Sequence, residues 1–178
     1  MKLLLLALSC TMVCLSADTN WQRILAERIP SYGHRNWIVV ADSAYPAQAK
    51  EGIETVVANA DQLQVLQVVM AALGNTKHVA PIIYTDHELK YLDDSEAPGV
   101  EAYRQRLDAM FKDKIVHSLD HEKIIERLDE ISKTFKVLII KTNMTVPYTS
   151  VFLELDCAYW GADAEKGLRA KMAAAGVR

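Results

Sequence analysis

The stretch of sequence that decides the fold reads Gly33-His34-Arg35-Asn36-Trp37-Ile38-Val39-Val40-Ala41-Asp42-Ser43-Ala44-Tyr45-Pro46. Its centre, residues 37–41, is a continuous apolar run, which is typical of a strand that is covered on both faces. Because open α/β sheets bind their ligands just beyond the carboxyl ends of the strands, we expect Asp42 to face a ligand. His34, which precedes the run, is the acid/base candidate.

Around this strand, apolar runs alternate with amphipathic segments along the chain. Strands are expected at 37–41, 53–58, 79–84, 114–118, 137–142 and 150–155. Helices are expected at 21–28, 61–73, 100–111 and 121–135, with one more at 160–172 outside the main core. Asp120 is the expected cap of the fourth helix, and the charged segment 86–99 is an expected loop. This alternation predicts an α/β fold, a single three-layer α/β/α domain with a mostly parallel or mixed sheet.

The first residues form a pattern of their own. Residues 1–17 are predicted to be a signal peptide, because Lys2 is followed by a short apolar stretch and then by small residues. The apolar part is too short for a membrane-spanning helix. We therefore expect an exported protein, located in the bacterial periplasm. A lipid anchor at Cys10 or Cys14 is a less favoured alternative.

The chain divides into three parts on this view. They are a signal peptide at 1–17, an α/β domain at 18–155 and a C-terminal helical extension at 156–178. After cleavage only Cys157 would remain of the three cysteines, so no disulfide within the chain is expected.

Charge and missing motifs narrow the function. The formal net charge is −3 and no basic stripe is present, so nucleic acid is not an expected partner. The sequence contains no phosphate-binding P-loop, no Gly-x-Gly-x-x-Gly turn and no Gly-x-Ser-x-Gly elbow. His117 and His121 have the spacing of a helical metal site, but His117 is expected to end a strand. Neither a metal nor a cofactor is therefore expected.

A combination of motifs carries a family resemblance. The pair Gly33-His34, with Asp42 eight residues after the histidine and Pro46 nearby, resembles the family of D-ribose pyranases and L-fucose mutarotases. The second half agrees, with His121-Glu122, an apolar strand, and Pro147-Tyr148 before another apolar strand. The resemblance covers about residues 20–155. It implies a monosaccharide substrate and a ring-shaped homo-oligomer.

The resemblance also implies roles for single residues. His34 takes the position of the proton donor, and Asp42 that of a sugar-binding carboxylate. His121 falls where ribose-type members place a sugar-contacting histidine and fucose-type members an arginine.

Tyr148, Thr149 and Ser150 match the family's binding triplet of a tyrosine, a small residue and an asparagine. Ser150 departs from that pattern, because a hydroxyl replaces an amide that can both donate and accept. The signal peptide is a second departure, since the familiar members work in the cytoplasm.

The length of the central strand constrains the site. Asn36 to Ala41 spans about 17 Å in an extended strand, so His34 and Asp42 are expected at its opposite ends. In a ring-shaped oligomer, His34 of one subunit could meet Asp42 of its neighbour, which places the site at subunit interfaces.

Three functions remain open at this point. The leading one is a mutarotase or pyranase, an isomerase that interconverts ring forms or anomers of a free aldose by general acid/base ring opening. The alternative is a non-catalytic exported monosaccharide-binding protein. The third, a metal hydrolase, would use His117, Asp120 and His121.

Overall fold

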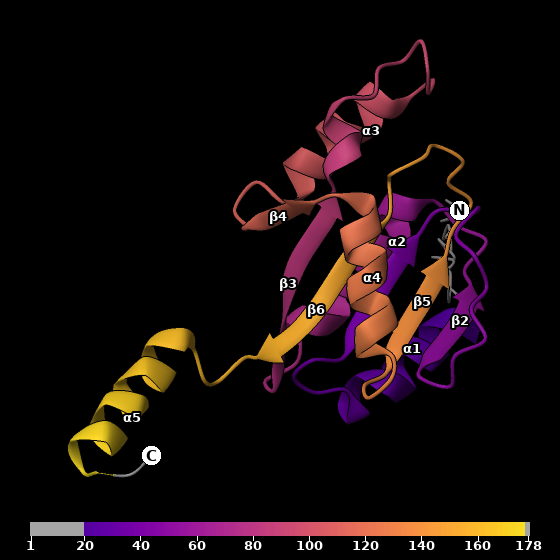
Figure 1. The fold of residues 1–178 in the computed structure, drawn as a ribbon. Helices are drawn as coiled ribbons and strands as arrows, with labels where there is room; N and C mark the ends of the chain where they lie inside the picture. Colours follow the sequence, from indigo (N-terminus) through magenta and orange to yellow (C-terminus); the bar gives the residue numbers. More distant parts are fainter. Residues whose placement is uncertain (1–19, 177–178) are drawn as a thin grey trace, which may run out of the picture.

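The computed structural model describes residues 20–176. A single β-sheet forms the centre of this part of the chain. Its strands are β1 (Trp37–Ala41), β2 (Ile53–Val57), β3 (Val79–Asp86), β4 (Val116–Leu119), β5 (Val137–Lys141) and β6 (Val151–Cys157). They form a six-stranded sheet in the order β2-β5-β1-β6-β3-β4. β6 is antiparallel to its neighbours β1 and β3, and the other pairs are parallel. The start of β6 therefore lies at the same edge as the carboxyl ends of the other strands (Figure 1).

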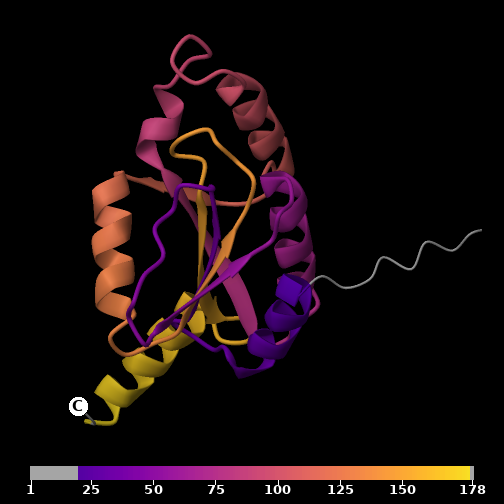
Figure 2. The same ribbon diagram turned by 90° about the vertical axis from the view of Figure 1, so that its right-hand side faces the viewer.

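Helices cover both faces of this sheet. The α-helices are α1 (Asn20–Arg28), α2 (Gln62–Gly74), α3 (Val100–Met110), α4 (His121–Ile131) and α5 (Ala162–Ala174), and two short 3-10 helices are η1 (Ile29–Ser31) and η2 (His87–Lys90). α1, α2 and α3 pack on one face and α4 on the other (Figure 2). This is the mixed α/β architecture that the sequence predicts. The predicted signal peptide, 1–17, lies outside the described residues.

β1 lies in the interior of the molecule, as its apolar run predicts. All its residues from Trp37 to Ala41 are 0% exposed. Ile38 and Val40 join the cluster beneath α1, α2 and α3, whereas Trp37 and Val39 join the cluster beneath α4. Burial on both faces fixes the register of the strand, because a slip of one residue would exchange the two faces.

α4 is held to the sheet by packing and by one arginine. The guanidinium of Arg127 lies 5.4 Å from the ring centre of Trp37 and 5.1 Å from that of Tyr84. It also donates to Glu154 on β6 at 2.8 Å. The aliphatic side chains of Ile124 and Leu128 complete the contact with the sheet. The start of α4 is therefore fixed relative to the carboxyl edge of the sheet.

The structure corrects one boundary at that edge and one at the far end of α4. β3 continues to Asp86 instead of ending at Tyr84, so Asp86 belongs to the sheet and not to the expected loop. α4 ends at Ile131 rather than at Phe135. The hydroxyl of Ser132 donates to the carbonyl of Asp129, and this local hydrogen bond accompanies the end of the helix.

The expected cap of α4 is also wrong. The side chain of Asp120 makes no capping hydrogen bond and instead accepts one from Lys123 at 2.5 Å. The carboxylate of Glu88, from η2, accepts the backbone N–H of His121 at 3.1 Å from each oxygen. A residue distant in sequence thus satisfies the helix start, which local sequence reasoning could not show.

α5 lies away from the body of the domain (Figure 1). None of its residues is buried, and Tyr159 just before it is 77% exposed. Cys157, at the end of β6, is half-buried. Within the described residues, no helix has the length and apolar character needed to cross a membrane.

Candidate functional site

The carboxyl edge of the sheet holds a cavity of about 570 Å³, here called the carboxyl-end cavity. Its walls come from residues 42–46 after β1, from the start of α4 and from residues 145–148 before β6. Asp42, His121 and Tyr148 all line it. The structure thus brings together three of the predicted site residues from distant parts of the chain.

The carboxylate of Asp42 is held by two donors. The hydroxyl of Ser150 donates to its Oδ2 at 2.9 Å, and the backbone N–H of Ala44 donates to its Oδ1 at 2.9 Å. The backbone N–H of Asp42 donates in turn to the Ser150 hydroxyl at 3.2 Å. These contacts orient the carboxylate at the cavity wall, where further lone pairs can accept hydrogen bonds from a ligand.

Thr149 and Ser150 lie beneath the cavity rather than on its surface. Ser150 is 2% exposed and Thr149 is 0% exposed. The Thr149 hydroxyl donates to the carbonyl of Val146 at 2.7 Å. The backbone carbonyl of Thr149 accepts from the Tyr103 hydroxyl at 2.7 Å and from the side-chain amide of Gln62. Of the predicted binding triplet, only Tyr148 lines the cavity.

Tyr148 has an uncommon backbone conformation. Its φ angle is 58°, in the left-handed region that residues other than glycine rarely adopt. Its ring meets that of His121 edge-on, with 5.5 Å between the ring centres. Strained residues of this kind cluster at binding sites, where the surroundings hold them.

His121 is paired with a buried carboxylate that the sequence did not single out. Its Nδ1 lies 3.1 Å from Oδ1 of Asp86, which is 1% exposed. Among the described residues, Oδ2 of Asp86 has no hydrogen-bond partner. Burial raises the pKa of Asp86 to about 6, against the opposing effect of His121. The strand-end rule that selected Asp42 would also have found Asp86, had β3 been extended by two residues.

Asp86 should make the stability of the protein depend on pH. Because its pKa is higher in the folded chain than in the unfolded one, the folded state binds the extra proton between about pH 4 and pH 6. This contribution to the free energy of unfolding falls as pH rises through that window. The free energy of unfolding of Asp86→Asn, relative to that of wild type, should therefore increase by about 3 kcal/mol between pH 4 and pH 7. Urea unfolding of both proteins measures this difference, and a difference that stays constant with pH would contradict the assignment.

His34 lies at the other end of β1. Its Nδ1 is 2.7 Å from Oδ1 of Asp156, at the end of β6, and its side chain is 55% exposed. The same Asp156 oxygen accepts the backbone N–H of Cys157 at 2.8 Å. Arg35, directly after the histidine, has a φ angle of 75° within the turn that leads into β1. Asp156 is thus a further residue that sequence reasoning missed.

One chain does not bring His34 and Asp42 together. The whole length of β1 separates them, about 16 Å for five extended residues. The expectation drawn from strand length therefore agrees with the structure. A site that uses both residues needs a second copy of the chain.

The residues of the metal-site hypothesis do not converge. The ring of His117 lies against Tyr84, 5.3 Å between centres, whereas Asp120 binds Lys123 and His121 binds Asp86. Within residues 20–176, no group of three His, Cys, Asp or Glu side chains is arranged to hold a metal ion.

The chain resembles known proteins in sequence pattern and in fold. The model of the RbsD / FucU transport protein family matches residues 20–157. RbsD of Bacillus subtilis, solved with D-ribose, aligns with a TM-score of 0.52 at 22% identity over 75% of this chain and 91% of its own. A fucose mutarotase of Streptococcus pneumoniae, solved with L-fucose, gives a TM-score of 0.49 at 20% identity, over 75% and 89% of the chains. FucU of Bifidobacterium longum aligns with a TM-score of 0.50 at 13% identity, over 75% of this chain and 94% of its own. A search of curated protein sequences finds no significant match.

Proposed function

Since the chain belongs to the RbsD / FucU transport protein family, we propose that it is a monosaccharide mutarotase or pyranase acting on a free ribose-like or fucose-like aldose. The observation that carries the proposal is the meeting of Asp42, His121 and Tyr148 in one cavity at the carboxyl edge of the sheet. A carboxylate, an imidazole and a tyrosine offer the hydrogen-bond acceptors, donors and flat apolar surface that a sugar ring needs.

The reaction opens and recloses the sugar ring. The anomeric hydroxyl loses its proton, the bond between the anomeric carbon and the ring oxygen breaks, and the ring oxygen gains a proton. The product is the open-chain aldehyde, which recloses on either face or through another hydroxyl. Proton transfers of this kind are performed by positioned side chains with a pKa near neutrality, such as histidine.

His34 is the proton donor in this proposal, and it acts in the site of a neighbouring subunit. Three observations support the role. Its side chain is more than half exposed, so a second copy of the chain can reach it. Asp156 binds Nδ1, which leaves Nε2 free to point outward and orients the ring. Among the described residues that line the carboxyl-end cavity with Asp42, His34 of the same chain is not included.

Asp42 binds the sugar hydroxyls, and Tyr148 forms one wall against the sugar ring. Ser150 acts indirectly, because its buried hydroxyl is committed to Asp42. The replacement of the family's asparagine by Ser150 therefore changes how the carboxylate is held, and the sugar meets Asp42 and Tyr148.

Saturation-transfer NMR with a panel of free aldoses tests the proposed function. The purified protein should accelerate exchange between the ring forms or anomers of at least one ribose-like or fucose-like sugar. Binding without faster exchange would instead favour the alternative, a non-catalytic monosaccharide-binding protein. If no sugar of the panel binds and none exchanges faster, both functions are refuted.

Export to the bacterial periplasm is a separate proposal, and it rests on residues 1–17 alone. Fractionation of cells that produce the full chain tests it, together with the mass of the mature protein. A protein that retains Met1 in the cytoplasm would refute export. A mass increased by acyl chains at Cys10 or Cys14 would indicate lipid anchoring.

A further inference from the structure

We propose that His121 is the second proton carrier of the reaction and that Asp86, buried behind it, is the residue that positions it. This inference rests on the proposed function, but it concerns a pair of residues within one chain. It divides the two proton transfers of ring opening between His121 of one subunit and His34 of its neighbour.

Three contacts fix the position of His121, two of them at its ring. Asp86 lies 3.1 Å from Nδ1, Glu88 accepts the backbone N–H of the same residue, and Tyr148 packs edge-on against the ring. Among the described residues Nε2 of His121 has no hydrogen-bond partner, and His121 lines the carboxyl-end cavity. Because the two nitrogens point in different directions, Nε2 is the atom left for a ligand.

The environment of Asp86 favours a role in protonation over a purely structural one. A buried carboxylate costs free energy unless its oxygens are paired, and Oδ2 of Asp86 has no partner within the described part of the chain. A neutral amide could hold the ring at a lower cost in stability. What the carboxylate adds is negative charge next to the imidazole, which stabilises the protonated ring.

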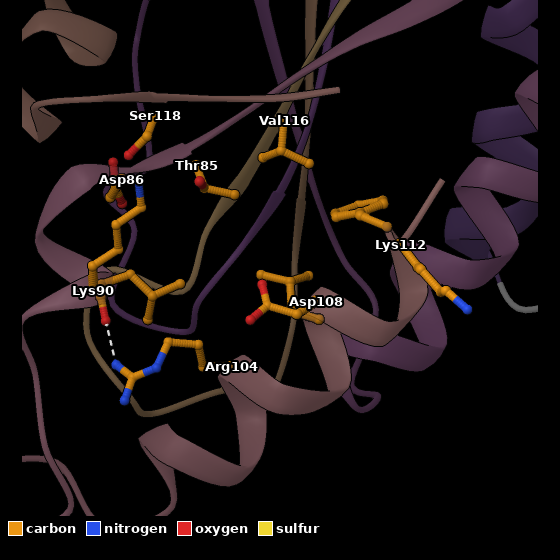
Figure 3. A pocket seen from close by; sticks show the side chains of 11 residues that line it. Thr85, Asp86, Lys90, Arg104, Asp108, Lys112, Val116 and Ser118 are labelled. Atoms are coloured by element: carbon orange, nitrogen blue, oxygen red, sulfur yellow. Dashed lines mark hydrogen bonds between the residues drawn. The ribbon is translucent and has the colours of Figure 1, made fainter. Parts of the chain in front are cut away.

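Other charged groups also face Asp86. On its far side is a second cavity of about 510 Å³, and Figure 3 shows the Lys90 side chain reaching from η2 toward Asp86. Arg104 of α3 is bound there to the carbonyls of Leu89 and Leu92 at 2.8 and 3.0 Å. Further titratable groups around Asp86 are Glu88, Asp42, Tyr45, Tyr103 and Asp108. Of all these groups, His121 is the one that bonds directly to Asp86.

The proton transfers balance with these two histidines. Nε2 of His121 takes the proton of the anomeric hydroxyl, while the protonated His34 of the neighbouring subunit gives its proton to the ring oxygen. The carbon–oxygen bond of the ring breaks, and the aldehyde forms. Nδ1 of His121 keeps its proton and its bond to Asp86, so the new imidazolium lies beside a carboxylate. Ring closure returns both protons.

The proton position on His121 is the first test, and it uses the wild-type protein. At a pH where the ring is neutral, 15N NMR should find the proton on Nδ1, where Asp86 accepts it. A neutral ring with its proton on Nε2 would overturn the proposal. This measurement needs no sugar and no variant, so it tests the pairing of His121 with Asp86 even if Asp86→Asn fails to fold or if the protein turns over no sugar.

The second test compares Asp86→Asn with Asp163→Asn, a matched change on the exposed helix α5. Asp86→Asn removes the negative charge next to His121 but keeps a side chain of the same size whose oxygen can accept from Nδ1. The exchange rate should fall by about ten- to a hundredfold, with a smaller change in KM. Asp163→Asn should match wild type. A folded Asp86→Asn protein that exchanges the sugar at the wild-type rate would overturn the proposal.

Discussion

Replacement of His34 by alanine is expected to slow ring exchange by about a hundred- to ten-thousandfold, the usual contribution of one positioned acid/base group. The side chain is largely exposed and lies outside the buried core, so the loss of its ring should leave the fold intact. Exchange spectroscopy with the preferred aldose measures the rate, and circular dichroism checks folding.

His117→Ala is the matched control for this change. His117 is also exposed, but it lies on the edge strand β4 and does not line the carboxyl-end cavity. It should keep a rate within about twofold of wild type. If His34→Ala is folded and equally active, His34 is not the proton donor.

Removal of the Asp42 side chain is expected to weaken sugar binding by about a hundredfold. A hydrogen bond to a charged group contributes about 1.5–3 kcal/mol, and one strong or two weaker bonds to sugar hydroxyls account for that factor. Asp42→Ala also leaves the hydroxyl of Ser150 without its carboxylate partner, so some loss of stability should accompany the loss of affinity. Titration of the sugar, followed by NMR or calorimetry, gives the dissociation constants.

Asp113→Ala provides the control for Asp42→Ala, because Asp113 is an exposed residue in a turn outside the cavity. Its affinity for the sugar should equal that of wild type. Equal affinities for Asp42→Ala and Asp113→Ala would mean that the sugar does not contact Asp42.

Local sequence patterns predicted the frame of this site well. The apolar run of β1 identified a strand buried on both faces, and its length placed His34 and Asp42 at opposite ends. Both conclusions depend only on residues that are near one another in the chain, where burial and spacing act directly on the pattern.

Asp86 and Asp156 were not predicted, because their contacts depend on the tertiary structure. Asp86 lies 35 positions before His121, and Asp156 lies 122 positions after His34, yet each carboxylate meets its histidine in the folded chain. Such pairs follow from strand order and not from local spacing. Polar residues at the end of β3 also concealed Asp86, because the sequence Thr85-Asp86-His87 resembles a loop.

Ser150 illustrates the same limit for a residue that was predicted. The family pattern suggested that its hydroxyl would meet the sugar, whereas the structure commits that hydroxyl to Asp42, 108 positions away. Glu88 likewise replaces Asp120 at the start of α4. Only the tertiary structure decides which of several nearby polar groups a donor reaches.

The most direct test of the account is a mixture of two impaired variants, His34→Ala and Asp42→Ala, at a sugar concentration too low for Asp42→Ala to bind. If each site takes His34 from one subunit and Asp42 from its neighbour, random exchange in an equal mixture restores both residues in about one quarter of the sites. We therefore predict that the mixture regains about one quarter of the wild-type exchange rate, once native mass spectrometry shows that subunits have exchanged. A mixture that stays as inactive as its components after confirmed exchange would contradict a site shared between subunits.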